Sequence, residues 1–182
     1  MERDILDVAW TVMARESAAA LNVREVARAV GLRQQSLTHY FPTKQDLLDA
    51  LFADGFTELR RVLDLVAADG DPTEAVVGVA QAVVTYCVTH PARYHLMLGR
   101  AVPGFAPSDA SHAVALGCLG VLVERLRAAG ITDPGDVALV RSLISGLAAE
   151  QIANDPEGDR YVTQTGRGVR TLVNGFSRTT RR

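Results

Sequence analysis

The segment VREVARAVGLRQQSLTHYFPTKQDLL, residues 23–48, decides the fold of this chain. Its spacing predicts a helix-turn-helix over about residues 22–41, in which Gly31 ends the first helix and the second helix covers 34–40. Glycine supplies the positive φ that the turn needs, and Ala27 is small where the second helix must pass closely over the first. Apolar residues at helical spacing can form the small core between the two helices: Val26, Val30, Leu32, Leu37 and Tyr40.

Hydrogen-bonding side chains are predicted to lie exposed at the start and along one face of the second helix. They are Arg33, Gln34, Gln35, Thr38 and His39. Side chains of this kind reach base edges when a helix enters the major groove of duplex DNA. The alternative is the polar face of an ordinary helical hairpin. A turn glycine, a small contact residue and this polar face in one register favour DNA binding.

The basic residues of the chain are unevenly distributed. The whole chain of 182 residues has a formal net charge of −2, which alone does not favour a nucleic-acid partner. Residues 22–45, however, carry four basic side chains against the single acidic Glu25, a net charge of +3. The four are Arg24, Arg28, Arg33 and Lys44. A basic segment in an otherwise acidic chain indicates the surface that meets a polyanion.

Composition and helical periodicity predict an all-α fold. Hydrophobic residues make up 48% of the chain and aromatic residues 5%, a balance that allows a buried core but does not favour β-structure. We expect about nine helices and no strand. The expected helices cover residues 2–16, 22–30, 34–40, 44–66, 72–90, a short stretch from Pro91, a stretch after the loop at 102–111 up to Ala129, 134–154 and 157–176.

Several classes of function find no support in the sequence. Cys87 and Cys118 are too few and too distant for a disulfide framework. Cys87, His90 and His95 lack a fourth zinc ligand, so we expect no metal and no cofactor. The sequence has no glycine-rich phosphate loop, nucleophile elbow or HExxH motif, and we expect no enzyme. Polar residues and a proline interrupt the uncharged stretch 75–92, so we expect a buried core helix, no membrane partner and a cytoplasmic location.

The stretch ILDVAWTVMARESAAALNVREVARAVGLRQQSLTHYFPTKQDLLDAL, residues 5–51, resembles the DNA-binding domain of the tetracycline-repressor (TetR) family of bacterial regulators. The resemblance implies that bases in the major groove face Gln34, Gln35, Thr38 and His39, that phosphates are gripped by Tyr40 and Lys44, and that further backbone contacts come from Asn22 and Arg24. Arg33 stands where Ser or Thr usually caps the recognition helix. We therefore expect the cap to be lost and a base or phosphate contact to be gained.

Lys44 is also singled out by its position. It is the only lysine of the chain, and it lies in the first turn of the long helix that starts there, where a cation opposes the helix dipole. A phosphate partner accounts for this placement better than the alternative, which is a merely solvated lysine.

The resemblance also implies three parts of the chain: a DNA-binding domain at 1–45, a ligand-binding and dimerisation domain at 46–177, and a basic tail at 178–182. The dimer of this family is a four-helix bundle of its last two helices, and two DNA half-sites require two heads. The alternative is an apolar stripe that faces only the core of its own chain. The residues expected at the dimer interface are Leu139, Leu143, Leu147, Ile152, Val169, Leu172, Val173 and Phe176.

An effector pocket is implied between the long helix at 44–66 and the helices that follow. Its candidate residues, each of which can equally belong to the plain core, are Phe56, Tyr86, Tyr94, Met97, Phe105 and Leu116. We expect a homodimeric regulator, usually a repressor in this family, that binds a palindromic DNA operator and is released by an unidentified small-molecule effector. The alternative is a helix-turn-helix DNA-binding protein without such an effector, controlled by a protein partner or by abundance.

Overall fold

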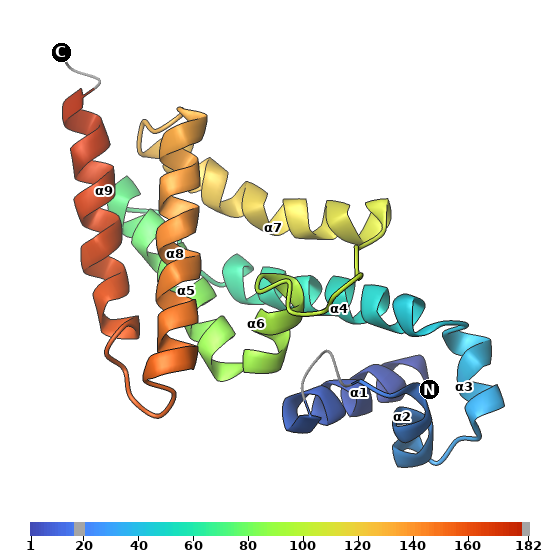
Figure 1. The fold of residues 1–182 in the computed structure, drawn as a ribbon. Coiled ribbons are helices and arrows are strands. Elements are labelled where there is room, and N and C mark those ends of the chain that lie inside the picture. The colour runs from blue at the N-terminus through green and yellow to red at the C-terminus, as the bar shows by residue number, and fades with distance from the viewer. Residues whose placement is uncertain (17–20, 180–182) are drawn as a thin grey trace. The chain divides into compact units, whose positions relative to one another are not determined.

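The computed structural model describes residues 1–16 and 21–179, which form nine α-helices, one short 3-10 helix and no strand (Figure 1). The predicted all-α fold is confirmed. The helices are α1 (Glu2–Glu16), α2 (Val23–Val30), α3 (Gln34–Tyr40), α4 (Lys44–Asp64), α5 (Pro72–Thr89), α6 (Pro91–Met97), α7 (Asp109–Ala128), α8 (Pro134–Asn154), η1 (Val162–Gln164) and α9 (Thr165–Thr179).

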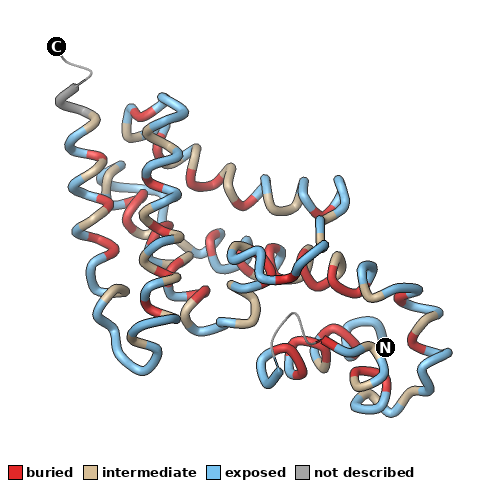
Figure 2. The backbone as a smooth tube through the Cα atoms, viewed as in Figure 1, coloured by how far each residue is buried: buried red, intermediate tan, exposed pale blue. Residues whose placement is uncertain are grey.

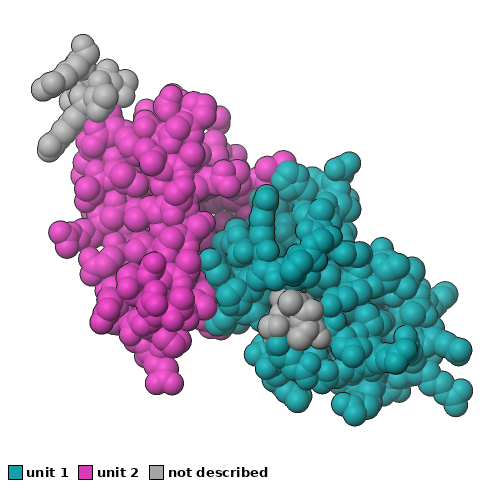
Figure 3. All heavy atoms as spheres, viewed as in Figure 1, with its two compact units in different colours: residues 1–57, 90–115 teal, residues 58–89, 116–182 magenta. Residues whose placement is uncertain are grey.

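The chain divides into two compact units (Figure 3). Unit 1 consists of residues 1–57 and 90–115, and unit 2 consists of residues 58–89 and 116–182. Helices α4 and α7 each pass from one unit into the other. The units follow contacts rather than function, so the division into a DNA-binding part up to residue 45 and a second part after it stays a prediction.

Aspartate followed by proline begins two of the long helices, α5 and α8. Asp71 accepts a hydrogen bond from the backbone N–H of Glu74 at 3.0 Å at the start of α5. Asp133 likewise accepts two backbone N–H groups, at 2.8 and 3.1 Å, at the start of α8. In both helices proline takes the first position, where its missing N–H group would have no partner within the helix.

The third pair, Asp155-Pro156, does not begin a helix, so the prediction of a helix over 157–176 is wrong at its start. Helix α8 ends at Asn154, and α9 begins only at Thr165. Arg178 lies within α9, whereas residues 180–182 of the expected basic tail lie outside the described part of the chain.

The side chain of Gln151, which is fully buried, explains this connection. Its Oε1 accepts hydrogen bonds from the backbone N–H groups of Tyr161 at 2.9 Å and Val162 at 3.2 Å. Its Nε2 donates to the backbone carbonyls of Asp155 and Gly158. Because one buried amide binds four backbone groups, the chain after α8 closes into a loop instead of entering a helix at once.

Unit 2 is built around α5, against which both α8 and α9 pack (Figures 1 and 2). Val76 and Val84 on α5 are fully buried, as expected of a core helix. An ion pair with two contacts, at 2.6 and 2.7 Å, joins Arg170 on α9 to Glu74 on α5. Within the described residues no single helix is long and apolar enough to cross a membrane, and only α5 and α6 together, bent by 110°, meet that length and composition.

Unit 1 has its own core, which holds the helix-turn-helix. Ile5 on α1, Val26 on α2, Leu37 on α3 and Leu51 on α4 are each fully buried. Helix α1 packs against α2, and α2 packs against α3. Helices α1, α2 and α3 are therefore joined by packing, and α3 is held in place by residues from outside its own short length.

Candidate DNA-binding site

The turn between α2 and α3 has the predicted geometry. Gly31 has φ +77° and ψ +21°, a left-handed conformation that a residue with a side chain rarely adopts. Its N–H donates to the carbonyl of Arg28 at 3.1 Å, and the N–H of Leu32 donates to the carbonyl of Ala27 at 2.8 Å. These bonds satisfy the last carbonyls of α2 while the chain changes direction.

The small core of the helix-turn-helix differs from the prediction in one aromatic residue. Val26 and Leu37 are fully buried as expected, and Val30 and Leu32 are half-buried, but Tyr40 is 42% exposed. The buried aromatic side chain at this end of α3 is Phe41, which is 4% exposed. Phe41 follows the helix in an extended conformation, with φ −130° and ψ 92°, so its side chain does not continue the helical face on which Tyr40 lies.

Helix α3 presents the polar residues predicted from the sequence. Gln34, Gln35 and His39 are exposed, and Thr38 is half-buried. The Thr38 hydroxyl donates to the backbone carbonyl of Gln35 at 2.9 Å, which leaves its lone pairs available as acceptors. Arg33 occupies the N-cap position without a side-chain cap hydrogen bond, which confirms that the usual cap is lost.

Helix α4 begins at Lys44, as expected, and its start is fixed by a reciprocal capping box. The backbone N–H and the hydroxyl of Thr43 donate to Asp46 Oδ2 at 2.8 and 2.7 Å, and the Asp46 N–H donates back to Thr43 Oγ1 at 3.2 Å. The Asp46 carboxylate complements the positive end of the helix dipole that Lys44 opposes. The Thr43–Asp46 capping box therefore fixes the backbone of Lys44 at the start of α4.

The remaining members of the predicted site lie on or beside α2. Asn22 is the N-cap residue of α2, and its Oδ1 accepts the backbone N–H of Arg24 at 3.0 Å. The side chains of Arg24, Arg28 and Arg33 are exposed. Two exposed guanidinium groups thus lie on α2 and a third lies at the end of the turn before α3, close in sequence to the polar face of α3.

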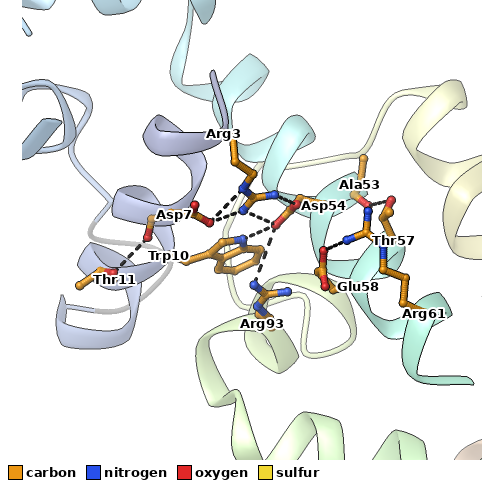
Figure 4. Close-up of polar contacts among 10 residues, drawn as sticks. All are labelled: Arg3, Asp7, Trp10, Thr11, Ala53, Asp54, Thr57, Glu58, Arg61 and Arg93. Atoms are coloured by element: carbon orange, nitrogen blue, oxygen red, sulfur yellow. Dashed lines mark hydrogen bonds and ion pairs between the residues drawn. The ribbon is translucent and has the colours of Figure 1, made fainter. Parts of the chain in front are cut away.

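A polar cluster around Asp54 was not anticipated from the sequence (Figure 4). Asp54 on α4 is 8% exposed and accepts hydrogen bonds from the guanidinium of Arg3 and from Trp10 Nε1 at 2.7 Å, both on α1. Arg93 Nη2 on α6 lies 4.0 Å from Asp54 Oδ2. Burial alone would raise the pKa of Asp54, but the hydrogen bonds from Arg3 and Trp10 hold that pKa below its usual value.

A second carboxylate on α4 fixes the start of α7 within unit 1. Asp49 accepts the backbone N–H of Ser108 at 2.7 Å, the Ser108 hydroxyl at 2.8 Å and the Ser111 hydroxyl at 2.8 Å. Burial raises the pKa of Asp49, but these hydrogen bonds outweigh it and leave the pKa lowered. Asp49 and Asp54 both lie on α4 and bind partners more than 40 residues away in sequence, so local sequence patterns do not predict these contacts.

The six pocket candidates are divided between the units. Phe56, Tyr94, Met97 and Phe105 belong to unit 1, whereas Tyr86 and Leu116 belong to unit 2. Within unit 1 the Phe52 ring lies 4.9 Å from the ring of Phe56 and 5.9 Å from that of Phe105, so these three rings form one row. The candidates Phe56, Tyr86 and Met97 are buried, but Leu116 is 52% exposed. Their role in ligand binding stays a prediction.

The expected dimer residues fall into two groups. Leu139 on α8 is 53% exposed, and the half-buried members are Leu143, Leu147, Ile152, Leu172 and Phe176. Val169 and Val173 on α9, by contrast, are 0% and 1% exposed within the single chain. These two valines belong to the core that α9 shares with α5 and α8, which leaves them no surface for a second subunit.

The three residues weighed as metal ligands have different surroundings. Cys87 on α5 is buried, which raises its pKa to about 12, and His90 occupies the N-cap position of α6 without a side-chain cap hydrogen bond. Burial, followed by the charge of Arg93, lowers the pKa of His90, and His95 is exposed on α6. No three His, Cys, Asp or Glu side chains within residues 1–16 and 21–179 are grouped to hold a metal ion.

The turn at Gly31, the exposed polar face of α3 and the neighbouring cations define a helix-turn-helix DNA-binding protein. The family model described as bacterial regulatory proteins of the tetR family matches residues 5–51. A second model, described as the tetracyclin repressor-like C-terminal domain, matches residues 76–180, more than half of the chain. The chain therefore belongs to the TetR family of transcriptional regulators.

Individual relatives agree with this assignment. The chain is 29% identical over 178 residues to the HTH-type transcriptional regulator Rv1816 of Mycobacterium tuberculosis, an alignment that covers 90% of this chain and 74% of that protein. Its fold resembles that of BioQ, solved with its natural double-stranded DNA operator, with a TM-score of 0.67, 19% identity and 96% of each chain covered. It also resembles a TetR variant from Acinetobacter baumannii AYE in complex with minocycline, with a TM-score of 0.68, 22% identity, and 96% and 95% covered.

Proposed function

We propose that the protein is a homodimeric transcriptional repressor. Two α3 helices, one from each subunit, enter successive major grooves of a palindromic operator, and a small-molecule effector releases the DNA. The observation that carries the proposal is the exposed polar face of α3, where Gln34, Gln35 and His39 offer hydrogen-bonding groups to solvent beside a basic segment.

The side chains of α3 support base recognition by their type and spacing. Gln34 and Thr38 are one helical turn apart, as are Gln35 and His39, so the four share one side of the helix. A glutamine amide pairs with the N6 and N7 atoms of adenine, and the guanidinium of Arg33 pairs with O6 and N7 of guanine. Each well-formed pair of this kind discriminates against a wrong base by about 1–3 kcal/mol.

Phosphate contacts are assigned to residues that flank this face. Lys44 and Arg24 supply charge, and Tyr40, which is 42% exposed, supplies a hydroxyl. The Oδ1 of Asn22 accepts the Arg24 N–H within α2, so a phosphate contact by Asn22 uses its amide hydrogens instead. These contacts position the helix-turn-helix on the duplex and carry no sequence information of their own.

The dimer is assigned to α8 and α9. The apolar side chains that keep exposed surface there are Leu139, Leu143, Leu147, Ile152, Leu172 and Phe176. Helices that expose leucine in a row bury it when a second copy supplies a matching face, which gives a four-helix bundle. Two heads are also what a palindromic operator requires.

Release by a small molecule is supported by the similar fold that was solved with minocycline. The candidate contacts within unit 1 are Phe56, Tyr94, Met97 and Phe105, of which Phe56 and Phe105 belong to the aromatic row. A protein partner or a change in abundance is the alternative means of control. Assaying apolar and aromatic small molecules for release of bound duplex separates the two, because only the first mechanism responds to them.

The test is a selection of duplexes from a random library by the purified full chain at about 150 mM salt, where non-specific binding has weakened and specific binding remains. The proposal predicts enrichment of a two-fold symmetric motif, referred to below as the selected duplex. A motif without symmetry would refute the dimer, and a folded, helical protein that enriches no motif would refute the operator.

A further inference from the structure

We propose that Asp54 is a positioning residue for DNA binding, because its carboxylate ties α6 to α1 and thereby sets the placement of α2 and α3. The residues involved are Arg3 and Trp10 on α1, Asp54 on α4 and Arg93 on α6, called the Asp54 cluster below (Figure 4). The proposal rests on the DNA-binding function proposed above, but the tie itself can be measured without DNA.

One carboxylate on α4 serves donors from two other helices. Its Oδ1 accepts the guanidinium of Arg3, its Oδ2 accepts the Trp10 indole N–H at 2.7 Å, and Arg93 Nη2 lies 4.0 Å from the same Oδ2. The Asp54 side chain is only 8% exposed, and that of Arg93 is 18% exposed, so solvent screens the interaction between these two groups weakly, whereas Arg3 is 48% exposed. A displacement of α6 therefore moves the charge of Arg93 relative to Asp54 Oδ2, the atom that accepts the Trp10 N–H.

Arg93 and Trp10 also contact each other directly. The guanidinium carbon of Arg93 lies 4.9 Å from the centroid of the Trp10 ring, within the range of a cation–π interaction. The ring is thus bound at its N–H edge by Asp54 and at its face by Arg93. It cannot keep both contacts if α6 moves away from α1.

The helices are closely packed beside this cluster. A Cβ atom on Gly55 would lie 2.5 Å from Met97 Sδ on α6 and 3.5 Å from Trp10 Cζ2 on α1. Met97 is itself buried, with an exposed fraction of 6%. Glycine inside a helix is unfavourable, and the close approach of α1 and α6 to α4 accounts for it here. Apolar packing and the Asp54 cluster thus join the same three helices.

Packing through α2 connects α1 to α3, the proposed recognition helix. Helix α1 packs against α2, and α2 packs against α3. Ile5 on α1, Val26 on α2 and Leu37 on α3 are all fully buried, so the three helices share an interior that resists sliding. A change in the position of α1 consequently changes where α3 presents Gln34 and Gln35.

The first experiment measures backbone hydrogen exchange in the free full chain for wild type, Arg93→Met and Arg93→Lys. Methionine keeps an apolar stem of similar length and removes the charge, whereas lysine keeps a cation over the ring. We expect exchange in residues 2–16, which lie outside the substituted helix, to be about threefold to tenfold faster in Arg93→Met and largely restored in Arg93→Lys. Arg61→Met is the matched control, because Arg61 on α4 is 68% exposed and pairs only locally, with Glu58.

The second experiment repeats the measurement with the selected duplex. We expect DNA binding to change hydrogen exchange in residues 91–97 of wild type and to change it less in Arg93→Met. We also expect the affinity for the selected duplex to be about threefold to tenfold lower in Arg93→Met and in Asp54→Asn than in wild type. A role limited to stability would lower the melting temperature of these variants without altering how α6 responds to DNA.

Two results would overturn the proposal. Exchange in residues 2–16 that is the same in Arg93→Met as in wild type would remove the tie between α6 and α1. An equal response of α6 to DNA in wild type and Arg93→Met, including no response in either, would remove its role in DNA binding. If no duplex binds at all, the proposed function fails, and the free-protein experiment still decides whether the tie exists.

Discussion

Replacing Lys44 by glutamine separates phosphate contacts from base contacts. Lys44 is the first residue of α4, behind the Thr43–Asp46 capping box, so the substitution removes a charge from a fixed position. Each phosphate neutralised on B-DNA contributes about 0.9 to the slope of log affinity against log salt. With one Lys44 in each of two subunits, we expect the slope to become shallower by about 1.8.

The slope translates into a measurable difference in affinity. Between about 50 and 200 mM salt, a slope difference of 1.8 corresponds to about a 12-fold difference in how much affinity is lost. Wild type should therefore lose about 12-fold more affinity than Lys44→Gln over this range. Because a phosphate contact carries no sequence information, the weakening at any one salt concentration should be the same for the selected duplex and for a scrambled duplex.

Fluorescence anisotropy with both duplexes at several salt concentrations provides the assay. Arg61→Gln is the matched control, since Arg61 lies on the same helix, outside the proposed site and 68% exposed. It should leave both slopes unchanged. An unchanged slope in Lys44→Gln, or a loss of affinity confined to the selected duplex, would refute the assignment of Lys44 to phosphate.

Three further predictions concern stability and assembly. Gln151→Leu leaves four backbone groups without their partners and should lower the free energy of unfolding by about 2–4 kcal/mol. In thermal denaturation this corresponds to a fall in Tm of about 4–16 °C. The control Gln164→Leu, at an exposed position, should change the Tm little. Because the pKa of Asp49 is lowered by folding, its contribution to stability is present above about pH 4 and lost as the pH falls through the folded-state value. Acid unfolding should therefore be less steep in Asp49→Asn, and an identical pH profile would contradict this. Leu139→Glu should raise the dissociation constant of the dimer by more than about tenfold in sedimentation experiments, and the control Leu65→Glu, at an 88% exposed position, should not.

Local signals made the helix-turn-helix and the starts of several long helices predictable from the sequence. The glycine at 31, the threonine at 43 and the aspartates at 71 and 133 act on backbone groups within four residues of themselves. Short sequence patterns therefore predict where these helices begin or end, and apolar periodicity predicts the helices themselves. The polar side chains of α3 belong to the same class, because a helix of seven residues with one buried leucine leaves its other faces to solvent.

Interactions between distant residues were not predictable in this way. The start of α9 depends on Gln151, which lies 10 and 11 residues before the N–H groups that it binds. The Asp54 cluster joins residues 44 and 51 positions apart, and no spacing rule connects them. Val169 and Val173 carry the apolar periodicity of an interface, but periodicity alone does not tell a face that meets a partner from one that meets the chain's own core.

The most direct test of the central claim, that α3 reads bases, is to run the duplex selection in parallel on wild type and Gln34→Ala. Gln34 is exposed at the first position of α3, so its replacement should leave the fold intact. The account predicts the same symmetric motif from both proteins, with preference relaxed at one position in each half-site. Motifs that are identical at every position, or preference lost evenly across the whole motif, would contradict it.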